Sequence, residues 1–398
     1  MPIIFHKNTK EFHLYNDEIS YIFCILRNGQ PGQIYYGRKI KDRESFQHLI
    51  EYSLRDMAPC TYEGDWTFSM EYLKQEYPSY GHGDMREPAY EILQEDGSRI
   101  TEFTFEDYVI LKGKRKLEGL PAVYTESDEE AETLEIYLRD RVMNTKIILS
   151  YTIFENLPVI IRNTRFVHEG ESSIVLERAM SLNLDLPDDR YEMVELTGAW
   201  ARERYVKTAP LHEGIQAIYS MRGHSSHQFN PFFALKRPET TEDAGEAIGI
   251  SLVYSGNFLG QTAVDTFGVA RAMIGIHPEG FSWTLKKGET FQTPEAVLVY
   301  SGEGLGKMSR TFHRLYRKRL ARGYWRDRVR PVVINNWEAT FMNFTEDKIL
   351  KFAETARKLG VEMMVLDDGW FGHRDDDTSS LGDWYPDPKK LPQGIRGL

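Results

Sequence analysis

The chain begins with the hydrophobic pattern of β-strands. Up to about Tyr300, short runs of β-branched and aromatic residues are separated by Gly, Asn, Asp and Pro, which favour turns. The segment 19–40 has two such runs around an Asn-Gly and a Pro-Gly pair, and the segment 280–300 repeats the arrangement around Lys287 and Gly288. Both segments are predicted to form β-hairpins. The candidate strands are too many for one small sandwich and indicate large stacked sheets.

The pattern changes from strand to helix near residue 303. Apolar Met308, Phe312, Leu315 and Tyr316 recur at helical spacing, and the helix is expected to end before Gly323. We interpret this helix as a connector between a β-rich part and the remainder of the chain.

The last part of the chain has the pattern of one β-α-β unit. The apolar runs 332–337 and 361–366 are typical of buried strands, and the segment between them has helical periodicity. Thr345 is the candidate N-cap of that helix, and Gly360 closes it. Parallel strands need neighbours at their edges and helices on both faces, so a lone unit is not a stable domain. We therefore expect the sequence to be the first portion of a longer protein.

Composition and charge narrow the classes of function. The chain is 41% hydrophobic and 27% charged, as in soluble globular proteins. Its net charge of −11 argues against a nucleic-acid partner, which needs clustered Lys and Arg. No secretory leader is visible, and no run approaches the roughly 20 apolar residues of a membrane span, so no membrane partner is expected. Two cysteines, Cys24 and Cys60, support no disulfide framework, and the expected location is the cytoplasm.

Candidate chemistry gathers where the strands of the β-α-β unit end. Asp367 and Asp368 follow the second strand, and Trp337 lies at the end of the first. In parallel α/β folds, ligands bind at the carboxyl ends of the strands. Two carboxylates beside Trp370 and Phe371 suit a sugar, which has hydroxyls on its edge and a C–H face that packs on an aromatic ring. The alternatives are a plain Asp-Asp-Gly turn and a metal pair, although no His at ligand spacing supports a metal.

Other polar and aromatic residues are weaker candidates. Trp200 follows a glycine within a charged run, where it is either a packing residue or a ligand platform. His224 and His227 are three residues apart, but without a third ligand we interpret them as loop residues rather than a zinc site. Asp84 and Arg86 are suggestive without indicating a particular chemistry. The acidic run 375–377 is interpreted as a solvated loop.

Five motifs, in order along nearly the whole chain, resemble the bacterial α-galactosidases of glycoside hydrolase family 36. They are GHGDMREPAY (81–90), GAWARERY (198–205), RGHSSHQFNPFFAL (222–235), VVINNWEATFMNFTEDKI (332–349) and VLDDGWFGHRDDDTSSLGDW (365–384). The resemblance implies an N-terminal β-supersandwich over 1–302, a helical linker over 303–330 and the start of a (β/α)₈ TIM barrel over 331–398. It also implies a small C-terminal β domain and a homotetramer.

The activity that the resemblance implies is hydrolysis of terminal α-galactose from melibiose, raffinose and related oligosaccharides, with retention of configuration and no cofactor or metal. Asp367 and Asp368 match paired aspartates that hold galactose hydroxyls. Trp337 matches a tryptophan that lines the same pocket. Trp200 matches an aromatic residue of the β domain that the family uses to contact substrate, contributed across a subunit contact.

The two catalytic carboxylates of the family are not among these residues. The family's nucleophile lies on a later barrel strand in a Lys-x-Asp-x-Asn-type motif, which does not occur after Trp337. Retaining glycosidases need two carboxylates roughly 5 to 5.5 Å apart, and neighbouring residues on one strand tend to diverge. We therefore interpret Asp367 and Asp368 as sugar-binding residues, and expect the nucleophile and the acid/base beyond Leu398.

Two other readings of the function stay open. A non-catalytic galactoside-binding or assembly protein would keep the β domain and bind sugars without cleaving them. Within the enzyme class, α-N-acetylgalactosaminidases and galactosyl-transferring synthases are related to the α-galactosidases.

Overall fold

The computed structural model describes residues 3–52 and 61–398. The chain divides into two compact units, Met1–Ala321 and Arg322–Leu398, and the division falls inside the segment 303–330 predicted as a linker. In the described part of the chain, no helix is both long and apolar enough to cross a lipid bilayer.

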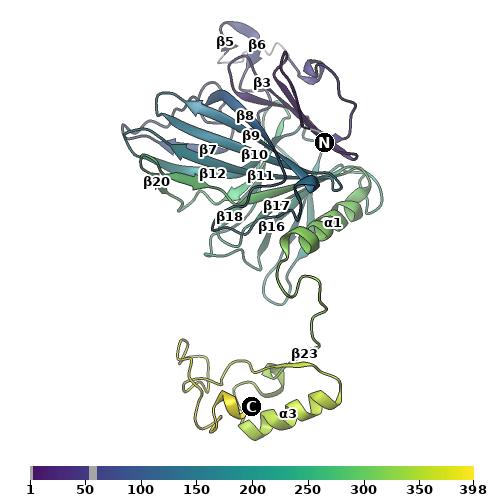
Figure 1. The fold of residues 1–398 in the computed structure, drawn as a ribbon, viewed down its shortest axis with the longest axis vertical. Coiled ribbons are helices and arrows are strands. Elements are labelled where there is room, and N and C mark those ends of the chain that lie inside the picture. The colour runs from purple at the N-terminus through teal and green to yellow at the C-terminus, as the bar shows by residue number, and fades with distance from the viewer. Residues whose placement is uncertain (1–2, 53–60) are drawn as a thin grey trace. The chain divides into compact units, whose positions relative to one another are not determined.

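The first unit consists mainly of antiparallel β-sheet (Figure 1). Its largest sheet has ten strands, in the order β14 (Tyr205–Pro210), β13 (Glu192–Thr197), β16 (Phe229–Lys236), β17 (Ala247–Val253), β22 (Glu295–Ser301), β11 (Val159–His168), β10 (Thr145–Phe154), β9 (Ala131–Asp140) and β8 (Thr104–Lys112), with β21 (Thr290–Gln292) also paired to β11. A six-stranded sheet has the order β15 (Gly214–Ser220), β18 (Phe258–Val264), β19 (Ala270–Ile276), β12 (Ile174–Asp185) and β20 (Trp283–Leu285), with β7 (Tyr90–Leu93) paired to β12.

Smaller elements complete this unit. A four-stranded sheet joins β1 (Ile3–His6), β2 (Glu11–Tyr15), β3 (Ile19–Ile25) and β4 (Pro31–Arg38), and β5 (Thr61–Tyr62) pairs with β6 (Asp65–Ser69). Two 3₁₀ turns lie at Gln47–Leu49 and Asp128–Glu130. The predicted large stacked sheets are confirmed.

One of the two predicted hairpins is correct and the other is wrong. In the segment 19–40, β3 and β4 pair as antiparallel neighbours, with Ile19 opposite Arg38. In the segment 280–300, β20 pairs with β12 of the six-stranded sheet, whereas β21 pairs with β11 of the ten-stranded sheet. The turn around Gly288 therefore carries the chain from one sheet to the other, and its two strands have different partners.

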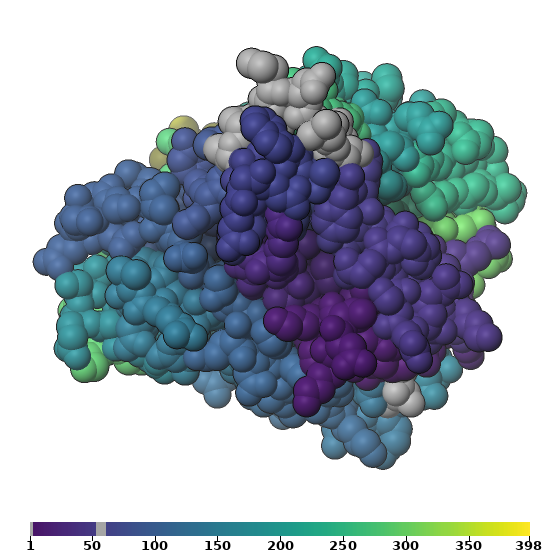
Figure 2. Space-filling model, turned by 90° about the horizontal axis from the view of Figure 1, so that it is seen from above, coloured from purple at the N-terminus to yellow at the C-terminus, as the bar shows by residue number. Residues whose placement is uncertain are grey.

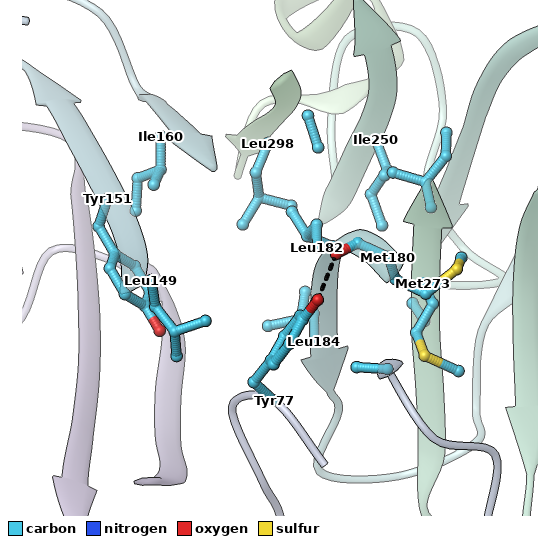
Figure 3. Packing of buried hydrophobic residues seen from close by; sticks show 14 of the residues in the cluster. Tyr77, Leu149, Tyr151, Ile160, Met180, Leu182, Leu184, Ile250, Met273 and Leu298 are labelled. Carbon is cyan, nitrogen blue, oxygen red and sulfur yellow. Dashed lines mark hydrogen bonds between the residues drawn. The ribbon is translucent and has the colours of Figure 1, made fainter. Parts of the chain in front are cut away.

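The main core lies between the two large sheets. Figure 3 shows Leu149 of β10 and Leu298 of β22, from the ten-stranded sheet, with Leu182 of β12 from the six-stranded sheet. These side chains are fully buried because successive strand residues point to opposite faces and the apolar set points inward. The Tyr77 hydroxyl donates to the backbone oxygen of Met180 at 2.7 Å, so this buried polar group is satisfied.

The four-stranded sheet packs against the ten-stranded sheet, and in Figure 2 the purple atoms near the N-terminus lie against the blue atoms that follow in the sequence. Phe23 stacks on Tyr151 with ring centroids 5.0 Å apart. Beside this stack, the Tyr151 hydroxyl donates to Glu76 at 2.8 Å, and Arg162 Nη1 lies 3.3 Å from the Glu76 carboxylate. Glu76 and Arg162 are buried at 0% and 1% exposure, so a charged pair lies inside an apolar core.

The predicted helix near residue 303 packs on a sheet of the same unit. Helix α1 (Gly304–Leu315) is followed by a π-helical turn, Tyr316–Leu320. Met308, Phe312 and Leu315 are buried in an apolar cluster with residues of β17 and β22. A Cβ at Gly249 of β17 would lie 2.8 Å from the Met308 sulfur and closer still to the Phe312 ring. Glycine at this position therefore allows the helix to approach the strand.

The second unit contains the predicted β-α-β arrangement. Strands β23 (Val333–Asn335) and β24 (Met363–Val365) are parallel, and α2 (Trp337–Thr340) and α3 (Glu346–Lys358) lie between them in the chain. A 3₁₀ turn, Ile395–Gly397, comes near the end. The predicted N-cap is confirmed, because the Thr345 hydroxyl accepts a hydrogen bond from the Lys348 backbone N–H at 3.4 Å.

Candidate functional site

The candidate site lies where the two parallel strands of the second unit end. Asn335 is the last residue of β23, and Asp367 follows β24 by two positions. Asn335 Nδ2 donates to Asp367 Oδ2 at 2.5 Å, and Asn335 Oδ1 accepts from the Trp337 backbone N–H at 2.8 Å. One amide side chain thus fixes both the carboxylate and the start of the segment that holds the tryptophan.

The Asp367 backbone is fixed by the neighbouring asparagine. Asn336 is fully buried, and its Oδ1 accepts from the Asp367 N–H at 2.7 Å. Its own backbone N–H donates to the Val365 oxygen at 3.3 Å, which continues the pairing of β23 and β24 by one step. The turn after β24 is therefore fixed to the end of β23 by hydrogen bonds from both strands.

Asp368 is held by a buried arginine. Arg374 Nε donates to Asp368 Oδ1 at 2.5 Å and Nη2 donates to Oδ2 at 2.8 Å, which is the bidentate geometry of a strong arginine–carboxylate pair. These hydrogen bonds, assisted by that of the Gly369 N–H, hold the pKa of the Asp368 carboxyl below its usual value. Asp368 therefore stays a carboxylate at neutral pH and acts as an acceptor.

The arginine is positioned in turn by its own loop. Arg374 Nη1 donates to the Ser379 oxygen at 2.7 Å, and Lys390 Nζ donates to the backbone oxygens of Gly369 and Arg374 at 2.9 and 2.7 Å. Lys390 is 8% exposed and also pairs with Asp375. These contacts close the loop 369–390 on itself and give the arginine a single orientation.

Gly369 is required by the backbone at the site. Its φ is +91°, in the left-handed region that side chains disfavour. A Cβ at this position would lie 3.0 Å from the Cα of Met342. The Asp-Asp-Gly sequence is thus a turn, which was the alternative to a sugar site in the sequence analysis. The same turn also presents two anchored carboxylates.

Aromatic residues lie on the segments that carry and follow the pair. Trp337 is half-buried and contacts Phe341 edge-on with ring centroids 5.3 Å apart. The sequence placed Trp337 at the end of a strand, but β23 ends at Asn335 and Trp337 is the first residue of α2. Trp384 is 65% exposed and lies over Phe371 with centroids 4.6 Å apart. Exposed apolar rings next to hydrogen-bond acceptors match the two faces of a sugar.

The arrangement favours binding over covalent chemistry. Asp367 accepts from Asn335 and from the Asp368 backbone N–H, and Asp368 accepts from Arg374 and Gly369. A carboxylate has about four acceptor positions, so each keeps capacity for a ligand hydroxyl. A carboxylate with a lowered pKa paired to arginine is a poor proton donor, which argues against Asp368 as general acid.

The remaining candidates of the sequence lie in the first unit. Trp200 is 85% exposed in the turn between β13 and β14. His224 Nδ1 hydrogen-bonds the Ser225 oxygen, and the described residues contain no group of three or more side chains suited to a metal ion. Asp84 and Arg86 are paired at 2.9 Å in a buried network. Of the four predicted site residues, the second unit brings together Asp367, Asp368 and Trp337.

Sequence reasoning missed the residues that orient the carboxylates: Asn335, Asn336, Arg374 and Lys390. Arg374 stands next to the acidic run 375–377, which the sequence presents as a solvated loop, yet it is 4% exposed. The available signal was the pair Asn335-Asn336, two polar residues that directly follow the apolar run 332–334.

Family models cover most of the chain. The model of the glycosyl hydrolase family 36 N-terminal domain matches residues 29–286, and a model named melibiase matches residues 290–398. α-Galactosidase AgaA of Geobacillus stearothermophilus is 48% identical over 398 residues, covering 100% of this chain and 54% of the relative. α-Galactosidase Mel36A of Lactobacillus acidophilus is 42% identical, covering 99% of this chain and 54% of the relative.

Solved structures match closely. An AgaA variant in complex with raffinose superimposes with a TM-score of 0.94 at 48% identity, over 97% of this chain and 54% of that one. The α-galactosidase of Lactobacillus brevis gives 0.96 at 44% identity, over 99% and 53%. The chain spans about half the length of the curated relatives it matches. These matches confirm the resemblance seen in the motifs, and the chain belongs to glycosyl hydrolase family 36.

Proposed function

We propose that this chain is the N-terminal part of an α-galactosidase that removes terminal α-linked galactose from oligosaccharides such as melibiose and raffinose. The observation that carries the proposal is the pair Asp367 and Asp368, anchored at the end of β24 beside Trp337. Relatives solved with raffinose and with stachyose support this class of substrate.

Each site residue has a proposed role. Asp367 and Asp368 accept hydrogen bonds from hydroxyls of galactose, and charge-assisted bonds of this kind are short and strong. Trp337 packs on the C–H face of the sugar ring. Trp200 is contributed to the substrate site by a neighbouring subunit, and its 85% exposure on a hairpin turn supports that role.

The bond is broken by other residues. In a retaining mechanism, one carboxylate attacks the anomeric carbon while a carboxylic acid protonates the departing oxygen, and water then releases the sugar from the covalent intermediate. Asp367 and Asp368 already accept hydrogen bonds from Asn335 and Arg374, which suits them to holding hydroxyls rather than to attack or proton donation. We place the nucleophile and the acid/base beyond Leu398, so we expect the 398 residues alone not to hydrolyse galactosides.

The proposed architecture is a β-supersandwich over 1–302, a helical linker over 303–330 and the start of a (β/α)₈ barrel over 331–398. Apolar Val333, Leu359 and Met363 are 49%, 78% and 48% exposed, which is the surface that further β-α units would cover. The exposed strand β14 suits a contact between subunits of a homotetramer. Buried Cys24 has a free thiol and suits the cytoplasm, while Cys60 lies outside the described residues.

An anomer-resolved assay tests this function. Purified protein that contains this chain and its continuation is mixed with an aryl α-galactoside, and the first galactose released is followed by NMR. The proposal expects the α-anomer, and hydrolysis of raffinose in the same preparation. Release of the β-anomer, or cleavage of the N-acetylgalactosaminide in preference to the galactoside, would overturn it.

A further inference from the structure

The first unit contains a large cavity, and none of the residues of the carboxylate site lines it. It has a volume of about 910 Å³, which is within the range of small-molecule sites. β11 and β21 of the ten-stranded sheet form one side, and the ends of β19 and β20 of the six-stranded sheet form the other. The loop 115–120 adds a third wall. The cavity thus opens where the two large sheets diverge.

Contacts with the ten-stranded sheet hold the loop 115–120 in place in the absence of a ligand. Lys114 forms a close ion pair with the buried carboxylate of Glu295, and Gln292 Nε2 donates to the Glu118 oxygen at 3.3 Å. The Gly113 N–H donates to the Ala131 oxygen at 2.8 Å, which joins the base of the loop to β9. A cavity formed in advance loses little conformational entropy when it binds a ligand.

One side of the cavity is aromatic. Trp283 is 50% exposed and contacts Phe291 with ring centroids 5.3 Å apart, and Phe281 contacts Phe291 at 5.5 Å. Phe291 is buried, so it supports the two outer rings from beneath. Tyr254 also lines the cavity. A half-exposed indole held by a buried ring is a suitable surface for the C–H face of a sugar.

The other side is cationic. Arg165 and Gln292 are opposite each other in the pairing of β11 with β21, so their side chains share one face. Arg115 and Lys116 reach the cavity from the loop. Arg115 lies 3.6 Å from Glu135, whereas Arg165 and Lys116 form no ion pair with any described residue. Glu118 also lines the cavity, but Arg115, Lys116 and Arg165 leave an excess of positive charge there, which favours an anionic ligand.

We propose that this cavity binds a saccharide bearing an anionic group, with the ring on Trp283 and the phosphate or carboxylate between Arg165 and Lys116. Neutral galactosides lack the anion, so this site is distinct in chemistry from the carboxylate pair, which favours neutral hydroxyls. The proposal does not depend on the hydrolytic activity.

Titration calorimetry on the intact protein tests the proposal with four probes: glucose 6-phosphate, galacturonic acid, glucose and inorganic phosphate. We expect saturable binding of at least one of the two anionic sugars, at least tenfold tighter than either glucose or phosphate. The tighter of the two anionic sugars identifies the anion as phosphate or carboxylate. Binding should weaken as salt rises, because the contact is partly ionic.

Variants locate the binding. Trp283→Ala and Arg165→Gln are each expected to weaken it at least tenfold, while Arg165→Lys retains part of it. The matched controls, Trp66→Ala and Arg99→Gln, change exposed residues that do not line the cavity and should bind like the unchanged protein. Absence of saturable binding by both anionic sugars, equal binding of glucose, or unchanged binding in folded Trp283→Ala and Arg165→Gln would each overturn the proposal.

Discussion

Asp368 and Arg374 show how one residue sets the state of another at the site. Two hydrogen bonds of 2.5 and 2.8 Å join them, and they lower the pKa of the carboxyl. In the proposed function, the carboxylate accepts ligand hydroxyls, and it is the stronger acceptor when it is ionised and correctly oriented. We therefore propose that Arg374 is a positioning residue that acts through Asp368.

Replacing Arg374 should reduce activity through Asp368. In Arg374→Ala, the misplaced carboxylate is expected to lower kcat/KM by up to roughly a hundredfold. The pKa of Asp368 rises towards its ordinary value, so the acid limb of the pH profile of kcat/KM should move to higher pH. Arg374→Lys keeps the charge but not the bidentate geometry, so its kcat/KM should lie between those of the unchanged enzyme and Arg374→Ala.

The pH profile separates positioning from a loss of folding. Arg357→Ala, in the last turn of α3, provides an exposed arginine control with no expected change. If Arg374→Ala lowers activity with its acid limb unmoved, the arginine does not act through Asp368.

Among the elements, the sequence predicted where strands and helices form better than it predicted which strands pair with each other. Thr345 and Gly360 correctly marked the ends of α3, because helix caps depend on the residues next to each end. The burial of Ile349 and Ala356 follows from helical spacing. The hairpin over 280–300 failed because a turn sequence does not determine which sheet each strand joins. Arg374 was missed for a similar reason, since its burial depends on the fold of the loop 369–390.

The N-cap of α3 provides a local test of this account. Thr345→Ala removes the hydroxyl that accepts from Lys348, and should lower the free energy of unfolding of the second unit by about 0.5 to 1 kcal/mol. Thr355→Ala is the matched control, because that hydroxyl only donates back to the Lys351 oxygen inside the helix. Urea unfolding followed by circular dichroism measures both, and equal effects would contradict the capping role.

At the scale of the whole molecule, a buried polar cluster joins elements far apart in the sequence. Tyr21 of β3, Tyr151 of β10 and Arg162 of β11 all surround Glu76, whose carboxylate accepts both hydroxyls. No local pattern in the sequence signals this cluster, because its members come together only when the four-stranded sheet packs on the ten-stranded one.

Removing only one charge of the buried pair Glu76 and Arg162 should destabilise the protein. Arg162→Met leaves Glu76 buried without its cation, and is expected to lower the free energy of unfolding by about 3 to 5 kcal/mol. Arg162→Met combined with Glu76→Gln should recover part of that loss, since both charges are then removed. Thermal and denaturant unfolding give the two values, and a double variant less stable than Arg162→Met would contradict this reading.

We propose that Asp367 and Asp368 hold galactose for a reaction performed by other residues. The most direct measurement is kcat/KM on an aryl α-galactoside for Asp367→Ala and Asp368→Ala in the enzyme that contains this chain, with exposed Asp377→Ala as control. The account predicts losses on the order of a hundredfold to a thousandfold for both site variants and none for the control. Unchanged kcat/KM in either site variant would contradict it.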